Sequence, residues 1–78
     1  MENISRMPIK QMRLIIKLWD SPDKMGFADG KSEGGTVKEL YKKGFVTPAG
    51  RFDRRLRWKI VESKFTENDI ALMRQLAK

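Results

Sequence analysis

The segment between Thr36 and Ile60 constrains the fold most, because a short helical pattern stops at Gly44 and leads directly into an arginine-rich alternating run. Thr36 and Glu39 have the spacing of a capping box, and a glycine in the left-handed conformation ends many helices. The expected apolar face holds Val37, Leu40 and Tyr41, and the expected cationic face holds Lys38, Lys42 and Lys43. We therefore predict a helix over about residues 36–43 with one packing side and one charged side.

A β-hairpin is predicted for about residues 45–61. Phe45-Val46-Thr47 has the composition of a brief strand, and Pro48-Ala49-Gly50 that of the turn after it. From Arg51 to Val61 polar and apolar residues alternate, which is typical of a strand with one buried face. The apolar row is Phe52, Leu56, Trp58 and Ile60, and the polar row is Asp53, Arg55, Arg57 and Lys59, with Arg54 interrupting the apolar row.

Helices are also predicted before this segment. Pro8 suits the first turn of a helix that continues to about Asp20, and residues 1–7 are expected to form a flexible tail. The apolar stripe of this helix consists of Ile9, Met12, Leu14, Ile15, Ile16, Leu18 and Trp19. Its predicted solvent-exposed face consists of Lys10, Arg13 and Lys17. Ser21-Pro22-Asp23 then predicts a second, weak helix. That helix would hold Met25, Phe27 and Ala28.

A loop and a last helix complete the predicted order. The run DGKSEGG from Asp29 to Gly35 has three glycines and no apolar residue, which favours a mobile loop. Thr66 and Asp69 form a second capping box, with Phe65 placed to pack against Ile70. The chain is thus predicted to be a single α+β domain over residues 8–78, with three helices, one of them weak, a basic hairpin and a C-terminal helix.

The charge balance favours a polyanionic partner. Lysine and arginine total 17 against 10 acidic residues, which gives a net charge of +7 in a chain of 78 residues. Such a field attracts nucleic acid most often, although anionic membranes and acidic proteins are attracted as well. The size allows one small hydrophobic core.

Several classes of function lack the residues that they need. Without cysteine or histidine there is no disulfide, no ordinary zinc site and no Ser-His or Cys-His nucleophile pair. Asp20, Asp23 and Asp29 lack the dense spacing of a calcium loop, and the Asp29–Gly35 run is no phosphate-binding loop. No apolar run approaches the roughly 20 residues that span a bilayer. We expect no enzyme, cofactor, small-molecule ligand or membrane partner, and a cytoplasmic protein that is nucleoid-associated if it binds DNA.

Two short motifs resemble those of winged helix-turn-helix proteins. The segment Leu40–Val46, followed by a basic hairpin, is similar to the end of a recognition helix and its wing. Tyr41–Pro48 matches the MerR-type wing pattern of Tyr, two polar residues, Gly, two apolar residues, any residue and Pro. Phe65–Ile70 with Leu72 looks like that family's start of the following helix. The resemblance covers residues 36–72 and implies a small winged-helix domain that binds DNA.

The first half of the chain departs from the MerR pattern, since a long apolar helix and a glycine-rich loop stand where that family opens with a helix-turn-helix. The segment between Pro48 and Phe65 is also longer than a usual MerR wing. We therefore carry over the winged-helix superfamily and not MerR membership.

The candidate DNA-binding residues lie on the predicted helix, the loop before it and the hairpin. They are Lys31, Ser32, Thr36, Lys38, Lys42, Lys43, Arg51, Arg54, Arg55, Arg57 and Lys59. Helix residues would face the major groove, and hairpin arginines would grip phosphates or enter a minor groove. The plain alternative is a solvated helix face beside an edge strand that charge protects from aggregation.

The sequence predicts a protein that binds double-stranded DNA, either sequence-specifically or as an architectural factor, and most simply a transcriptional regulator. A homodimer on a palindromic site would raise its affinity. Two other classes remain open. One is an RNA-binding or ribosome-associated module that uses the same hairpin, and the other is a protein-protein adaptor that docks to an acidic partner.

Overall fold

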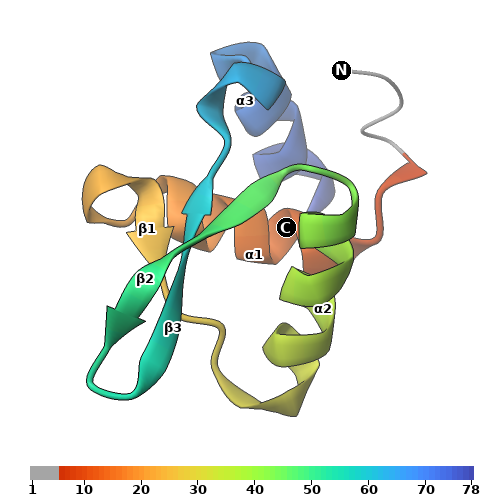
Figure 1. Cartoon of the computed structure of the whole chain (residues 1–78). Helices are drawn as coiled ribbons and strands as arrows, with labels where there is room; N and C mark the ends of the chain where they lie inside the picture. Colours follow the sequence, from red (N-terminus) through yellow and green to blue (C-terminus); the bar gives the residue numbers. More distant parts are fainter. Residues whose placement is uncertain (1–5) are drawn as a thin grey trace.

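The computed structural model describes residues 6–78 and contains three α-helices and a three-stranded antiparallel sheet (Figure 1). The helices are α1 (Ile9–Trp19), α2 (Gly30–Lys42) and α3 (Glu67–Leu76), and the strands are β1 (Met25–Gly26), β2 (Val46–Phe52) and β3 (Arg55–Ile60). Two short 3-10 turns, Pro22–Lys24 and Glu62–Lys64, precede β1 and α3. The predicted α+β class is confirmed.

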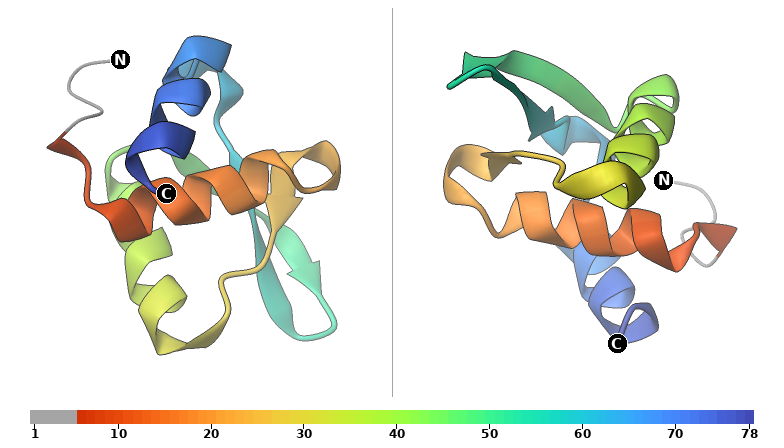
Figure 2. Two further views of the ribbon diagram at one scale, coloured as in Figure 1. Left: turned by 180° about the vertical axis from the view of Figure 1, so that it is seen from behind. Right: turned by 90° about the horizontal axis from the view of Figure 1, so that it is seen from below.

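Helix α1 forms the centre of the core, with α2 and α3 packed against it (Figure 2). Its buried apolar residues are Met12, Leu14, Ile15 and Leu18. Each such side chain contributes about 1.5–3 kcal/mol when fully buried. Ile9, which was predicted to lie in the buried stripe, is 49% exposed. Met7, predicted to belong to the tail, is buried in the core, whereas residues 1–5 of that tail lie outside the described part.

A buried glutamine fixes how α1 meets α2. Gln11 Nε2 donates to Glu39 Oε2 at 2.8 Å, and its Oε1 accepts from Lys43 Nζ at 2.7 Å. An unpaired buried amide is costly, and here the oxygen and the nitrogen each have a charged partner. The two helices are therefore held in one register by polar contacts as well as by apolar packing.

Helix α2 begins six residues earlier than the sequence predicts, so the expected mobile loop over Asp29–Gly35 is wrong. Thr36 lies inside the helix, and its hydroxyl donates to the Ser32 carbonyl at 2.9 Å in place of capping. Contacts with α1 stabilise this early start, because Lys17 Nζ of α1 lies 2.8 Å from a carboxylate oxygen of Asp29 and 2.7 Å from one of Glu33. These ion pairs and packing outweigh the poor helix propensity of glycine.

The end of α2 is as predicted. Gly44 takes a φ of +82°, its N–H donates to the Tyr41 carbonyl, and the Phe45 N–H donates to the Leu40 carbonyl, both at 3.0 Å. This pair of bonds is a Schellman motif, which needs a left-handed residue where Gly44 stands. The chain leaves the helix and enters β2 through this reversal.

The hairpin turn lies at Asp53-Arg54, and the turn predicted at Pro48–Gly50 is wrong. Strand β2 runs through Pro48 and Gly50, with a register shift between Pro48 and Arg51. Because β2 is an edge strand, the missing proline N–H costs little, and Gly50 with a φ of +86° accommodates the irregularity as a bulge. Asp53 and Arg54, both at positive φ, then form a two-residue turn.

The weak helix predicted after Ser21 is replaced by a 3-10 turn and strand β1. Asp23 and Lys24 both have positive φ, which stops a helix. Strand β1 then pairs with β3, and a Cβ on Gly26 would meet Leu18 Cδ2 at 3.0 Å. This glycine lets the strand pass close to α1.

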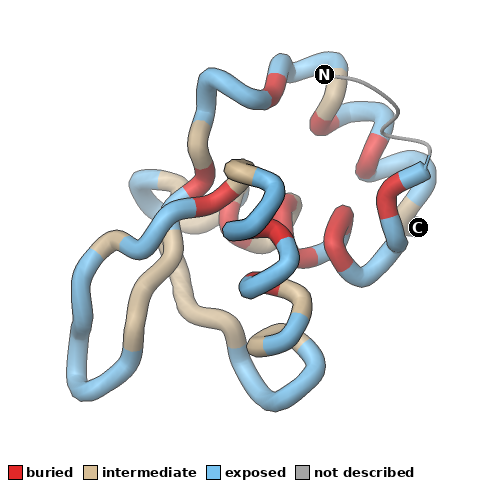
Figure 3. The backbone as a smooth tube through the Cα atoms, turned by 45° about the vertical axis from the view of Figure 1, so that its right-hand side comes forward, coloured by how far each residue is buried: buried red, intermediate tan, exposed pale blue. Residues whose placement is uncertain are grey.

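The capping box predicted for α3 is confirmed. Thr66 Oγ1 accepts from the Asp69 N–H at 3.1 Å, and Asp69 Oδ2 accepts from the Thr66 N–H at 2.8 Å. Phe65 and Ile70, expected to pack together, are both part of the buried core. Figure 3 shows that buried residues gather where the helices and the base of the hairpin meet, whereas the far end of the hairpin is exposed.

Candidate nucleic-acid interface

The two faces of the hairpin follow from the strand register. Strand β3 lies between β1 and β2, so Trp58 faces Gly26 and Pro48, while Ile60 faces Val46. Directly opposed residues share a face, and Leu56, Trp58 and Ile60 therefore share the core side as predicted. Phe52 does not, because it lies opposite Arg55. The two-residue turn between them places Phe52 on the arginine face, which corrects the sequence prediction.

Helix α2 touches the core side of the hairpin through an aromatic pair. The ring centroids of Tyr41 and Trp58 lie 5.8 Å apart with an interplanar angle of 59°. Tilted pairs at this separation are favourable beyond the area that they bury. The last turn of α2 and the middle of β3 are thus neighbours, which the sequence did not indicate.

One side of α2 presents lysines that have no partner among residues 6–78. Lys31, Lys38 and Lys42 are exposed, and their spacing places them near one line along the helix. None of them makes a side-chain hydrogen bond or ion pair within that range. Ser32 is also exposed at the start of the helix. These four candidates lie where a ligand could reach them.

The other two candidates on this segment are already engaged. Lys43 Nζ donates to Gln11, and the Thr36 hydroxyl donates back to the helix. Thr36 is half-buried. Neither side chain is presented with the exposed lysines.

The tip and the outer part of the hairpin carry further exposed cations. Arg51 lies at the end of β2, Arg54 lies in the turn, and Lys59 lies opposite Thr47 and Met25. Within residues 6–78 these three side chains have no ion-pair partner. We use the name cationic surface for these three residues together with the α2 lysines, that is Lys31, Lys38, Lys42, Arg51, Arg54 and Lys59. Within it Arg51, which lies opposite Leu56, and Lys59 lie on opposite faces of the hairpin.

Arg55 and Arg57 make contacts within the protein. Arg55 Nη2 is paired with Asp29, and its guanidinium lies 4.3 Å from the ring centroid of Phe27. The Arg57 guanidinium lies 5.8 Å from the ring of Phe52, and its Nε is buried without a hydrogen-bond partner in residues 6–78. Sequence reasoning missed these partners, since no local pattern links Arg55 to a residue 26 positions away.

Asp29 joins three elements through one carboxylate. It accepts from Lys17 of α1 and from Arg55 of β3, and these two bonds hold the pKa of Asp29 below its usual range. Burial would lower the pKa of Lys17, but hydrogen bonds to Asp29 and Glu33 outweigh it, so that pKa is raised. Burial opposes ionisation of Glu33, yet the Lys17 bond leaves its pKa lowered. The acidic groups at the start of α2 are therefore neutralised inside the protein.

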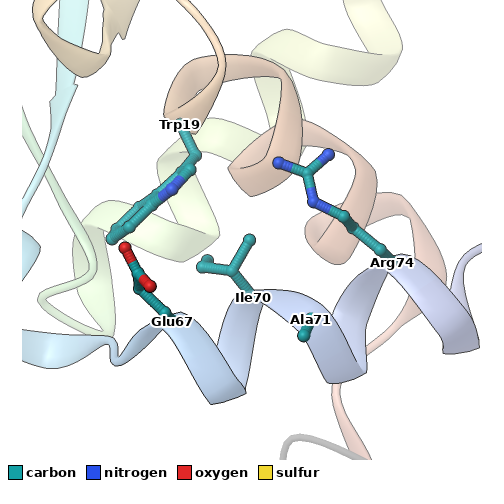
Figure 4. Close-up of a pocket in the computed structure, with 5 residues that line it drawn as sticks. All are labelled: Trp19, Glu67, Ile70, Ala71 and Arg74. Atoms are coloured by element: carbon teal, nitrogen blue, oxygen red, sulfur yellow. The ribbon is translucent and has the colours of Figure 1, made fainter.

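A separate pocket of about 260 Å³ lies between the end of α1 and α3 (Figure 4). Its lining residues are Trp19, Glu67, Ile70, Ala71 and Arg74. Arg74 donates to both carboxylate oxygens of Asp20, at 2.9 and 2.5 Å, and this bond lowers the pKa of Asp20. The pocket's only cation therefore has an acidic partner already.

A second hollow, of about 430 Å³, lies between the start of α1 and the first half of α2. It is lined by Pro8, Lys10, Gln11, Lys31, Ser32, Gly35, Thr36 and Glu39. Three of the sequence-predicted candidates, Lys31, Ser32 and Thr36, border it. The hollow extends the cationic surface around the helix towards α1.

Asp20 and Asp29, two of the three aspartates that the sequence offers as possible metal ligands, have different partners in the structure. Asp20 is paired with Arg74, whereas Asp29 is paired with Lys17 and Arg55. In the described range no three acidic side chains gather as metal ligands.

Among the helices between residues 6 and 78, none is both long enough and apolar enough to cross a membrane. No family model, curated protein or solved structure matches this chain.

Proposed function

We propose that this protein binds double-stranded DNA through the exposed side of α2 and the hairpin beside it. The observation that carries the proposal is the separation of charge on α2. Its acidic residues Glu33 and Glu39 are bonded to α1, whereas its exposed lysines have no partner within the described chain. Charges that are not neutralised internally are available to phosphates.

A helix with a row of exposed lysines supports a duplex partner. The major groove is about 12 Å wide and admits one α-helix. With α2 in that groove, Lys38 and Lys42 would contact phosphates or guanine edges, and Arg51 and Arg54 would reach the adjacent backbone. The role that fits is regulatory or architectural, and two copies on a palindromic site would raise affinity and specificity.

The test is a binding titration with matched duplexes. Fluorescence anisotropy would follow a random-sequence DNA duplex and an RNA duplex of equal length across a series of salt concentrations. We expect DNA to bind more tightly than RNA, with an affinity that falls steeply as salt rises. The slope of log affinity against log salt concentration should be about −0.9 for each phosphate contacted. Equal binding to any polyanion would contradict the proposal, and stronger binding to RNA would favour the RNA-binding alternative.

Paired variants locate the surface. Lys38→Ala with Lys42→Ala should weaken DNA binding and reduce the salt slope by about 2. Lys64→Ala with Lys78→Ala removes the same charge at exposed positions outside α2 and the hairpin. This control should retain most of the affinity. Equal losses in both pairs would show that net charge, and not this surface, drives binding.

A further inference from the structure

Phe52 is the most exposed of the large apolar side chains described, with 62% of its surface accessible. It is the last residue of β2 and directly precedes the turn at the tip of the hairpin. A phenylalanine exposed to this degree at a protruding tip gains little from folding. A contact outside the chain would bury it.

The tip holds this ring in a defined position. Phe52 is paired with Arg55 across the hairpin, and the guanidinium of Arg57 lies 5.8 Å from its ring centroid. Asp53 and Arg54 close the turn in two residues. The ring therefore lies at the end of a short ribbon of two paired strands, β2 and β3.

The charge around the ring limits what can cover it. Arg51 directly precedes Phe52 and Arg54 follows two residues later, with the exposed Asp53 between them. Both arginines are exposed and have no ion-pair partner within residues 6–78. A partner that fits must offer a flat apolar surface with negative charges on both sides. Stacked base pairs between two phosphate backbones have this chemistry.

We propose that Phe52 is a wedge that enters between adjacent base pairs from the minor groove, with Arg51 and Arg54 on the flanking phosphates. The proposal rests on the DNA binding proposed above and adds that the bound duplex is bent. Apolar wedges of this kind unstack one base step and kink the duplex by about 20–90°. Flexible pyrimidine–purine steps such as TA are the easiest to open, so they are the preferred sites.

The test uses a duplex with 2-aminopurine beside a central TA step and a fluorophore pair on its ends. With the wild-type protein we expect 2-aminopurine emission to rise and energy transfer between the ends to increase. Phe52→Ala should abolish both changes and weaken binding to this duplex about 5-fold or more, the loss expected for one stacked base. Phe52→Leu keeps an apolar wedge and should retain the bend.

Leu72→Ala is the matched control, because Leu72 is another exposed apolar residue but lies on α3. It should leave both signals unchanged. The wedge proposal would be overturned if Phe52→Ala bends the duplex as much as the wild type does. It would also be overturned if Phe52→Leu no longer bends the duplex at all. If the wild type binds the duplex tightly but changes neither the 2-aminopurine emission nor the energy transfer, only the wedge proposal fails. If the wild type does not bind the duplex, the proposed function fails as well. Binding to phosphatidylserine vesicles that is lost in Phe52→Ala, without base unstacking, would assign the ring to lipid.

Discussion

The base and the tip of the hairpin belong to the same two strands but have opposite environments. Val46 and Ile60, which face each other at the base, are 2% and 1% exposed, whereas Phe52 near the tip is 62% exposed. The base is covered by the helices, and the tip extends beyond them (Figure 3). Val46 and Ile60 lie on the core side, whereas Phe52 lies on the arginine face near the tip. The register of the strands and the covering elements together therefore decide whether a strand residue is buried.

Truncation at the base should have the largest effect on stability. Ile60→Ala leaves a cavity in the core, and we expect it to lower the free energy of unfolding by about 2–5 kcal/mol. Phe52→Ala at the tip should change it by no more than about 0.5 kcal/mol, as is usual for surface positions. Urea unfolding followed by circular dichroism measures both. Similar losses would show that the tip is covered in solution.

The junction where α2 enters the base should be the next most sensitive position. Gly44→Ala forces a side chain into the left-handed region and should cost about 1–2 kcal/mol. Crowding is not the cause, because a Cβ at Gly44 would meet only Lys64 Cε at 4.0 Å. Gly35→Ala, inside α2 with open space around it, should instead stabilise by about 0.5–1 kcal/mol. Thermal unfolding of the two variants should therefore shift in opposite directions.

At the tip, the turn itself can be improved. Asp53→Asn with Arg54→Gly supplies the pair that two-residue hairpin turns prefer at positive φ, and should raise stability by about 0.5 kcal/mol. The double change removes one charge of each sign, whereas Arg54→Gly alone removes only a positive charge from the cationic surface, so DNA affinity should fall in that single variant. Arg54→Gly alone, compared with Arg51→Ala, would separate turn chemistry from charge. A lower melting temperature would contradict the turn assignment.

The smallest effect is expected at the ion pairs between the hairpin and the helices. Because the pKa of Asp29 is lowered in the folded state, its contribution to stability is present above the unfolded value of about 3.9 and is lost as pH falls through the folded value. Asp29→Asn should therefore flatten the loss of stability below about pH 4. Asp23→Asn, at an exposed residue with no ion pair in the described chain, is the control for melting curves recorded from pH 6 to pH 2.

The ends of helices were predictable where local chemistry sets them. The Thr66–Asp69 box and the Gly44 stop depend on residues within a few positions of one another. The start of α2 was not, since Lys17 on another helix supplies two of the stabilising bonds, beside the local bond that the Asp29 N–H donates to Glu33 Oε1 at 2.8 Å. Pro48-Ala49-Gly50 is a strong local turn signal, but a bulge on an edge strand accommodates the same residues.

The candidate surface was predictable to a similar degree. Helical periodicity correctly placed Lys38 and Lys42 on the exposed side of α2. It also placed Lys43 there, whereas its partner Gln11 lies 32 positions away. The contact of Arg55 with Asp29 was likewise invisible, because long-range ion pairs leave no periodic signal. Phe52 was assigned to the core, since the position of the turn decides its face.

The glycine-rich start of α2 has a consequence for motion. Gly34 and Gly35 lie within the helix that begins at Gly30, and each glycine costs about 0.5–1 kcal/mol relative to alanine. This half of α2 is held by its contacts with α1 and not by its own propensity. We expect its amide protons to exchange with solvent sooner than those of α1, through local openings that leave the rest of the protein folded. The half of α2 that carries Lys31 should thus open before α1.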